Sequence, residues 1–228
     1  MPGVARRTQL AARRVDDGVR LVTWNVHGLA RPDPVALARA LAELDPDVIC
    51  LQEVRRHQAR TIARVLGWRR GFWTFQHNAW YVLPFRAEGL AILARNGVAN
   101  ASKVVLSGRV PWFSHKRRVA QLAWVGRWPI VNTHLSGGSD HERLLELRQL
   151  LGYVPATAVL AADISEHAGG PTVCALVGAG WQHQPASDDC PEHIFVPRAA
   201  VLSSIKRAEA RAPWSLLSDH LPIVAELA

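Results

Sequence analysis

The stretch Asp47-Val48-Ile49-Cys50-Leu51-Gln52-Glu53 decides the fold prediction, because four consecutive apolar residues stop abruptly at an amide and a carboxylate. An apolar run of this length is typical of a strand that is covered on both faces and therefore has no reason to alternate. Glu53 ends this strand. Its carboxylate either faces a cleft or begins the next helix, whose first turn favours negative charge. The ends of the other strands bear on this choice.

The chain has 228 residues, of which 49% are hydrophobic, and this size suits one large α/β domain better than two small ones. Its 27 Lys and Arg residues against 19 Asp and Glu give a net charge of +8 and a pI of about 10.4. Such a balance suits an anionic partner, and nucleic acid, phospholipid and phosphate esters all remain open. Arg greatly outnumbers Lys, which a GC-rich genome also produces, so charge alone does not choose among these partners.

The three cysteines, Cys50, Cys174 and Cys190, are odd in number and widely spaced, which predicts a reducing compartment and no disulfide framework. No apolar stretch approaches the roughly 18–20 residues of a membrane span, and no secretion signal is recognisable. We therefore expect a cytoplasmic monomer without a transmembrane segment. Residues 1–19 form an Arg-rich leader, which is either a frayed terminus or a basic arm, and residues 20–228 form the single domain.

Hydrophobic periodicity predicts a strand, a helix and a second strand in the first part of the chain. A strand is expected at 19–26, and Asp33-Pro34 then starts a helix that Asp45-Pro46 ends. Another helix is expected at 58–66, and Ser139 with Glu142 predicts a capping box at the start of a later one. The further strands are expected at 72–95, 103–106, 118–125, 129–135, 158–163, 192–196 and 217–224.

Two groups of residues suit either a structural role or contact with nucleic acid. The aromatic residues of the third predicted strand region are Phe72, Trp73, Phe75, Trp80, Tyr81 and Phe85. They suit a core, and they also suit stacking on bases. The basic cluster His115-Lys116-Arg117-Arg118 suits a solvated turn or contact with phosphates.

Polar side chains end five of the predicted strands or the turns beside them. They are Asn25, Glu53, His134, Asp163 and the pair Asp219-His220. In an open α/β sheet such ends line the ligand crevice. Oxygen ligands dominate the set, which favours Mg²⁺ or Mn²⁺ over zinc. Any one of these residues has a structural interpretation, such as a turn for Asn25, but their coincidence predicts a functional site.

Five motifs follow one another in the chain: Thr23-Trp24-Asn25-Val26, Leu51-Gln52-Glu53, Gly89-Leu90-Ala91-Ile92-Leu93, Asn132-Thr133-His134-Leu135 and Ser218-Asp219-His220. Together they resemble the endonuclease/exonuclease/phosphatase superfamily, which has the DNase-I-like fold. The resemblance runs from about Arg20 to the C-terminus. It implies an α/β fold, a four-layer α/β sandwich of two packed mixed, mostly antiparallel β-sheets flanked by helices. The strand and helix alternation alone suggests a parallel sheet instead.

The resemblance also implies a reaction, the Mg²⁺-dependent hydrolysis of a phosphoester by in-line attack of water. Such esters resist attack because negative charge builds on the phosphate and leaving oxygens, and a metal with hydrogen-bond donors offsets that charge. By this resemblance, Glu53 would hold Mg²⁺ or Mn²⁺, and Asn25 and Asp219 would be direct or water-mediated ligands.

The remaining roles are carried over in the same way. His220 would be the general base or a cation that stabilises the transition state, His134 would donate to the phosphate or leaving oxygen, and Asp163 would position the water. The chain departs from the family pattern at Ser165, where an Asn is usual, and at Glu192, where an Asp is usual. Ser165 keeps a hydrogen-bond donor with less reach, and Glu192 would orient His220 with one more methylene.

The substrate is the part that the resemblance leaves open, because the same site serves many phosphoesters. The basic charge and the lack of a secretion signal favour an intracellular nuclease that acts on DNA or RNA through backbone contacts. The alternatives are a phosphoesterase for phospholipids or small phosphate esters, and a catalytically weakened member that binds a polyanion. Retention of His220 disfavours the latter, because binding alone needs no general base.

Overall fold

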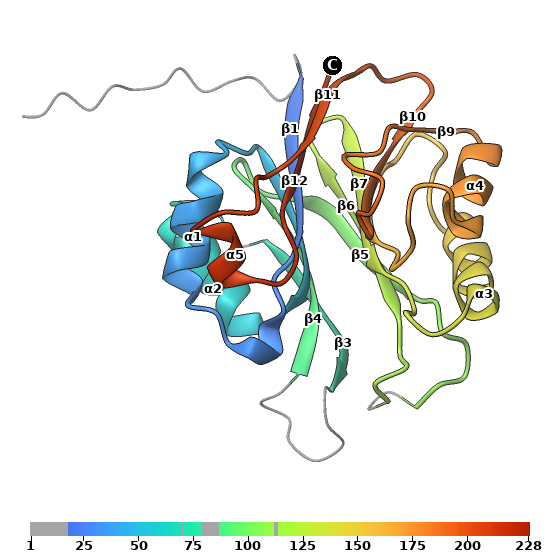
Figure 1. The fold of residues 1–228 in the computed structure, drawn as a ribbon, viewed down its shortest axis with the longest axis horizontal. Coiled ribbons are helices and arrows are strands. Elements are labelled where there is room, and N and C mark those ends of the chain that lie inside the picture. Colours follow the sequence, from blue (N-terminus) through green and yellow to red (C-terminus); the bar gives the residue numbers. More distant parts are fainter. Residues whose placement is uncertain (1–17, 70, 79–86, 112–113) are drawn as a thin grey trace, which may run out of the picture.

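The computed structural model describes residues 18–69, 71–78, 87–111 and 114–228, and two six-stranded sheets make up its centre (Figure 1). The first sheet has the order β11 (Leu202–Arg207), β12 (Ile223–Leu227), β1 (Val19–Asn25), β2 (Val48–Val54), β4 (Ala87–Ala94) and β3 (Phe72–Asn78). The second has the order β5 (Ala99–Val105), β6 (Val119–Val125), β7 (Trp128–His134), β8 (Val159–Asp163), β10 (Glu192–Pro197) and β9 (Trp181–His183).

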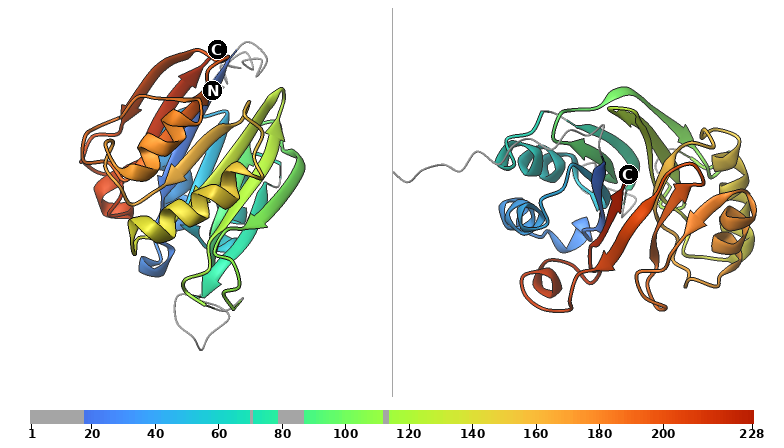
Figure 2. Two further views of the ribbon diagram at one scale, coloured as in Figure 1. Left: turned by 90° about the vertical axis from the view of Figure 1, so that its right-hand side faces the viewer. Right: turned by 90° about the horizontal axis from the view of Figure 1, so that it is seen from above.

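Helices cover the outer face of each sheet, as the views in Figures 1 and 2 show. The first sheet carries α1 (Pro34–Glu43), α2 (Arg56–Val65) and α5 (Trp214–Leu217), and the second carries α3 (Asp140–Leu151) and α4 (Pro171–Gly178). A short 3-10 helix, η1 (Gly28–Ala30), follows β1. The four-layer sandwich predicted from the resemblance is therefore confirmed.

The two sheets are mixed, and their parallel pairs lie where the sequence alternates strand, helix and strand. β1 and β2, joined by α1, are parallel, and so are β7 and β8, joined by α3. Every other strand pairing of the described residues is antiparallel. The local inference of a parallel arrangement is thus correct within each crossover and wrong for the sheets as a whole, because hairpins and long returns add the other strands.

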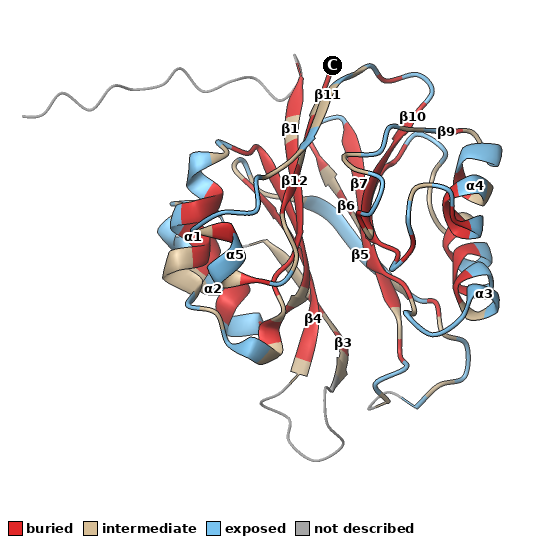
Figure 3. Ribbon diagram, in the orientation of Figure 1, coloured by how far each residue is buried: buried red, intermediate tan, exposed pale blue. Residues whose placement is uncertain are grey.

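Three apolar clusters hold the layers together, and Figure 3 shows the buried residues along the inner strands. One lies between the sheets and includes Cys50 and Ile194, another joins the first sheet to α1 and α2, and the third joins the second sheet to α3 and α4. Since both faces of β2 are covered, its run of apolar residues does not alternate. The buried strand predicted from this run is confirmed.

A layer of buried amides connects the two sheets directly. The Gln52 side-chain nitrogen donates to Asn132 Oδ1 at 2.8 Å and to Thr23 Oγ1 at 2.9 Å. Asn132 Nδ2 in turn donates to the backbone oxygens of Leu51 at 3.0 Å and Ala91 at 3.1 Å, both in the other sheet. Gln52 precedes Glu53, so this layer fixes the strand end from which that carboxylate projects.

We expect Asn132→Leu to lower the free energy of unfolding by about 2–4 kcal/mol. The substitution leaves the buried Gln52 side chain and two backbone oxygens without their partner, and each buried polar group that loses its partner costs about 1–3 kcal/mol. Urea denaturation measures the change. Gln149→Leu, on an exposed position of α3, is the matched control and should change stability by less than about 0.5 kcal/mol. Equal stability of the two variants would contradict the structural role of the amide layer.

Some boundaries differ from the prediction. The strand expected at 217–224 is confirmed only from Ile223, because Ser218 Oγ accepts the backbone N–H of His220 at 3.2 Å and turns the chain. The predicted capping box of α3 is half formed, since Ser139 caps Glu142 N while the Glu142 carboxylate binds Ser136 Oγ instead.

Other elements begin early or were not predicted. α2 starts at Arg56, two residues before the expected 58, because the Gln58 side chain accepts the backbone N–H of Arg55. The patterns did not predict α4, α5, β9 or β11. Residues 1–17 of the expected leader, and the aromatics Trp80, Tyr81 and Phe85, lie outside the described residues. Within the described part of the chain, no helix is long and apolar enough to cross a membrane.

Candidate active site

The predicted site residues of both sheets lie at one end of the sandwich. The parallel pair β1 and β2 ends at Asn25 and Glu53, and the parallel pair β7 and β8 ends at His134 and Asp163. His134 is in register with Asp163 on the neighbouring strand, and Glu192, at the start of the antiparallel β10, is in register with Asp163 on its other side. The expectation that polar strand ends meet is thus realised within each sheet and across the gap between them.

Glu53 reaches this gap through a break in the strand. Strand alternation would direct Glu53 away from the other sheet, because the preceding Gln52 points toward it. A register shift between Leu51 and Val54, with a φ of 51° at Glu53, inserts one extra residue. The Glu53 carboxylate lies 3.8 Å from Nδ1 of His134 in the opposite sheet. Glu53 therefore belongs to the strand end and not to the following helix.

Asp163 is the buried centre of the site. Asn25 Nδ2 donates to its carboxylate at 2.8 Å, and His134 Nε2 lies 3.8 Å from the same oxygen. The backbone N–H of Ser165 donates to the other oxygen at 3.1 Å. Asn25 also accepts the backbone N–H of His27, so its amide both forms the turn after β1 and orients Asp163. The interpretation of Asn25 as a turn former is therefore confirmed, and its functional role stays a prediction.

His220 is held by Glu192, as the resemblance implies. Its Nδ1 forms a short hydrogen bond with the Glu192 carboxylate, whose other oxygen accepts Cys190 Sγ at 3.2 Å. Burial alone would lower the pKa of His220, but the hydrogen bond and charge of Glu192, together with Asp163 and Asp219, raise it to about 9. The longer Glu192 side chain therefore still reaches the imidazole.

Asp219 lies at the exposed rim. One carboxylate oxygen is 3.1 Å from His27 Nδ1, and the neighbouring Ser218 hydroxyl donates to the backbone oxygen of Asn25 at 2.8 Å. The loop before β12 is thus tied to the turn after β1. All eight predicted site residues lie at this end of the sandwich, with Ser165 and Asp219 toward solvent.

Glu88 is an acidic residue that the sequence analysis did not select. It is buried in β4, and one of its oxygens would lie 3.0 Å from a side chain added at Gly28. Burial raises the pKa of Glu88 to about 8, helped by the charge of Glu53 and opposed by Arg55. The signal in the sequence was a carboxylate inside the apolar run Ala87–Ala94.

Arg118 and the neutral His77 lie next to the site, and neither was assigned to it from the sequence. Burial first, and then Arg118 and His134, lower the pKa of His77 to about 3. Burial lowers the pKa of Arg118, while Glu146, Glu53 and Asp163 oppose this. Within the described residues, His77 Nδ1, Arg118 Nε and His134 Nδ1 are buried without a hydrogen-bond partner. These nitrogens suit the oxygens of an anion.

A chain of neutral imidazoles supports β10 behind the site. His193 Nε2 lies 2.9 Å from the backbone oxygen of Glu166, which can only accept, so this nitrogen carries the proton. His193 Nδ1 then accepts from His183 Nε2 at 3.0 Å. Burial and the neighbouring His193 lower the pKa of His183 to about 4, and burial lowers that of His193. Both rings are therefore neutral at pH 7.

This histidine pair predicts a loss of stability in acid. Because the pKa of folded His183 lies below its unfolded value near 6.5, the unfolded chain binds more protons, and stability falls as the pH drops from about 6.5 toward about 4. His183→Gln keeps a nitrogen donor and does not titrate. We expect its free energy of unfolding to fall less steeply over this pH range, measured by urea denaturation at each pH. If the free energy of unfolding fell equally steeply with pH in the wild type and in His183→Gln, the lowered pKa of His183 would be contradicted.

Ser165 has a φ of 56°, in the left-handed region, and this strained position is where the family pattern has Asn. Asn tolerates this conformation better than Ser does. We expect Ser165→Asn to raise the free energy of unfolding by about 0.5–1 kcal/mol, because Gly137 leaves open space beside the side chain. Thermal unfolding measures the change, with Ser165→Ala as the control that should not gain stability. A less stable Asn variant would show that the pocket, not the backbone, selects Ser.

The residues present fit a divalent cation. Among the described residues, the half-buried Glu53 carboxylate accepts no hydrogen bond, and its charge opposes ionisation of the nearby Glu88. A hard cation would offset the negative charge of the Glu53 carboxylate. A second group, Asp163, Glu192 and His220, has its ligand atoms within 4.8 Å of one another. Glu192 is already engaged by His220 and Cys190, so Glu53 is the better centre for a cation.

A sandwich of two mixed six-stranded sheets with helices on its outer faces is the architecture of the DNase-I-like class. Residues 22–153, more than half of the chain, match the Endonuclease/Exonuclease/phosphatase family, and the chain belongs to this family. Its members are phosphoesterases, and divalent metal dependence is general among them. The matched range contains Asn25, Glu53 and His134 and ends before Asp163.

Solved structures share the fold. An endonuclease/exonuclease/phosphatase from Beutenbergia cavernae DSM 12333 has a TM-score of 0.76 and 19% identity, over 92% of this chain and 71% of its own. Mannosyl-6-phosphatase Bt3783 from Bacteroides thetaiotaomicron has a TM-score of 0.68 and 18% identity, over 92% and 99%. D. rerio TDP2, complexed with a single-strand DNA product, has a TM-score of 0.66 and 15% identity, over 93% and 100%. Among curated protein sequences, none matches significantly.

Proposed function

We propose that this protein is a Mg²⁺-dependent phosphodiesterase that hydrolyses DNA or RNA. The observation that carries the proposal is the pairing of His220 with the buried Glu192 beside Asp163, which Asn25 orients. A protein that only bound an anion would need neither an oriented imidazole nor a buried carboxylate facing it. Because the folds of both a phosphatase and a DNA-bound enzyme are similar, the fold does not distinguish the substrates.

The proposed roles follow from the contacts of each side chain. Glu192 accepts a hydrogen bond from Nδ1 of His220 and helps to raise its pKa to about 9. The imidazole is therefore mainly protonated at pH 7 and acts as a cation that stabilises the transition state, or, in its neutral form, takes a proton from the attacking water at Nε2. Asp163 accepts a hydrogen bond from that water and orients it, since Asn25 holds its carboxylate in place. His134 donates to the phosphate or leaving oxygen, and Ser165, whose backbone N–H donates to Asp163, is a further substrate contact.

Two further features support a polyanionic substrate. Arg118, with its unpartnered Nε, offers a donor to a phosphate oxygen beside Glu53 and Asp163. Glu53 would hold Mg²⁺, with Asn25 and Asp219 as direct or water-mediated ligands, and a bound cation would offset negative charge on the phosphate. The net charge of +8 favours nucleic acid over a neutral lipid surface or a small ester.

Hydrolysis of a mixed panel tests the proposal. The panel contains supercoiled plasmid, single-stranded DNA, RNA, an abasic-site duplex, a small phosphodiester, a phosphomonoester and phospholipid vesicles, each with Mg²⁺, Mn²⁺ or EDTA. We expect metal-dependent cleavage of a nucleic acid. Turnover of the phosphomonoester or phospholipid alone would replace the proposed substrate, and binding without any turnover would identify a weakened polyanion-binding member.

A further inference from the structure

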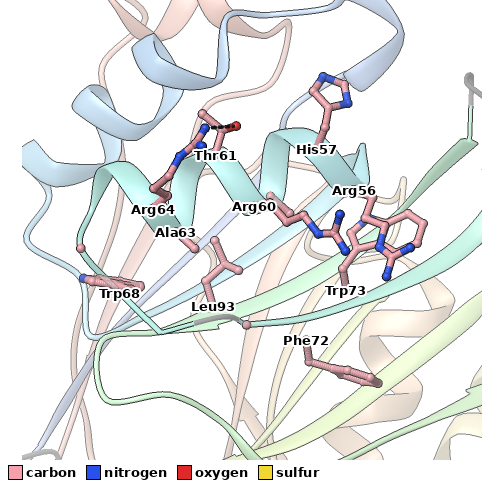
Figure 4. A pocket seen from close by; sticks show the side chains of 13 residues that line it. Arg56, His57, Arg60, Thr61, Ala63, Arg64, Trp68, Phe72, Trp73 and Leu93 are labelled. Atoms are coloured by element: carbon pink, nitrogen blue, oxygen red, sulfur yellow. Dashed lines mark hydrogen bonds between the residues drawn. The ribbon is translucent and has the colours of Figure 1, made fainter.

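A groove of about 770 Å³ lies between α2 and the strands β3 and β4, on the outer side of the first sheet (Figure 4). Its most informative lining residues are Arg56, Arg60, Arg64, Trp68, Phe72 and Trp73. None of the active-site candidates lines it. The groove is therefore a separate feature that the hydrolytic site does not explain.

The arginines form one stripe along α2. Arg56, Arg60 and Arg64 recur every four residues, which places successive side chains about 6 Å apart along one face of a helix. All three are exposed, whereas Ala59 and Ile62 belong to the buried face. Packing of the helix thus does not account for the stripe.

The charge of this region is strongly one-sided. Between Glu53 and Glu88 the sequence contains seven Arg residues and no Asp, Glu or Lys, so this segment carries a formal charge of +7 in a chain whose net charge is +8. Within the described residues, none of Arg56, Arg60 and Arg64 forms a salt bridge. The charges of the stripe are free for an external anion.

Aromatic rings lie beside the arginines. Trp68 and Trp73 are only half-buried and line the groove on the side of α2, whereas the Phe72 ring points to the other face of β3. Trp73 is fixed in place because its indole N–H donates to the backbone oxygen of Val54 at 2.9 Å, and the guanidinium of Arg56 lies 5.9 Å from its ring centroid. Rigid aromatic faces next to cations are the elements on which unpaired bases stack.

The groove begins next to the active site. Val54, which holds Trp73, directly follows Glu53, and Arg56 opens α2 two residues later. From Arg56 to Arg64 the helix extends about 12 Å away from that point. A ligand in the groove can therefore continue into the site.

We propose that this groove binds a single-stranded nucleic acid, with the phosphates along the arginine stripe and the bases against Trp68 and Trp73. Bases paired in a duplex do not present free faces to these rings, and rings recessed between a helix and a strand do not meet a flat membrane surface. The link to cleavage rests on the proposed phosphodiesterase function, whereas the binding itself does not.

The test measures binding of the full chain to a fluorescent 12-residue oligo(dT) by anisotropy, in EDTA and over a range of salt concentrations. In the first variant Arg56, Arg60 and Arg64 are replaced by Ala. We expect at least tenfold weaker binding and a salt slope smaller by about 2, since each lost phosphate contact contributes about 0.7. The matched control replaces Arg39, Arg148 and Arg198, three exposed arginines elsewhere, and should keep both the affinity and the slope.

Trp68→Leu keeps an apolar side chain and removes a stacking face, and it should weaken binding several-fold with an unchanged salt slope. Equal losses in the stripe variant and the arginine control would overturn the proposal, because they would show a non-specific charge effect. It would also be overturned if the stripe variant lost binding to vesicles containing phosphatidylserine but kept binding to oligo(dT). Oligo(dT) binding without hydrolysis would leave this inference standing while contradicting the proposed function.

Discussion

His220→Ala should lower the rate of phosphodiester hydrolysis by about 10²–10⁴-fold, because it removes a positioned proton-transfer group. Substrate binding should change little, since the Nε2 side of the imidazole would act on the water and not on the rest of the substrate. The measurement is turnover of the preferred panel member, with binding measured separately in EDTA. A variant with wild-type turnover would exclude the proposed role of His220.

The stability of this variant needs its own control. Glu192 is buried, and His220→Ala leaves its charge with only the Cys190 thiol as a partner, which is destabilising. His220→Asn retains an amide donor for Glu192 without a titratable nitrogen. If both variants lose turnover and the Asn variant keeps the wild-type unfolding midpoint, the loss is chemical and not structural.

Glu53→Gln should abolish Mg²⁺ or Mn²⁺ binding and lower hydrolysis by at least about 10²-fold. The amide has nearly the same size as the carboxylate but lacks the charge that a hard cation requires. A metal that binds only the folded chain increases the free energy of unfolding, by about 2.7 kcal/mol at a concentration 100 times the Kd. The unfolding temperature rises with it. We expect this metal-dependent shift in the wild type and not in Glu53→Gln, measured by thermal unfolding and titration calorimetry.

Glu43→Gln provides the matched control, because Glu43 is an exposed carboxylate on α1 far from the strand ends. It should keep both the thermal shift and the turnover. Retention of the metal-dependent shift in Glu53→Gln would mean that the cation lies elsewhere, and the cluster of Asp163, Glu192 and His220 would then be the next candidate.

The sequence predicted most of the sheet strands and the set of polar strand ends, because both depend on local patterns of polarity. It predicted Glu53 as a strand end but not how its side chain turns toward the other sheet. The positive φ of Glu53 arises where its backbone oxygen would lie 2.1 Å from a side chain added at Gly28, a contact between distant elements. Local propensity contains no information about such an approach.

The positions of Arg118 and His77 could not be predicted from local sequence either. Arg118 was predicted only as part of a basic cluster, and His77 was not selected from the sequence. Arg118 lies near Glu53 and Asp163, and His77 lies near Arg118 and His134. Both positions depend on how β3 of one sheet faces β6 of the other. The tight turn at Ser218 replaced the first part of the last predicted strand for a local reason, the hydroxyl that binds the N–H of His220. A Ser two residues before the His was the available signal.

The hydrogen-bonded amides of Gln52 and Asn132 keep the two sheets in a fixed alignment. Glu53 and Asn25 come from one sheet and His134 and Asp163 from the other, so each sheet alone carries half of the proposed site. A slide of one sheet past the other by a single ångström would leave every strand intact and still separate the two halves. The hydrogen bonds that Gln52 and Asn132 form between the sheets oppose that slide. Alignment of the sheets, more than their individual strength, is what the catalytic end of the sandwich requires.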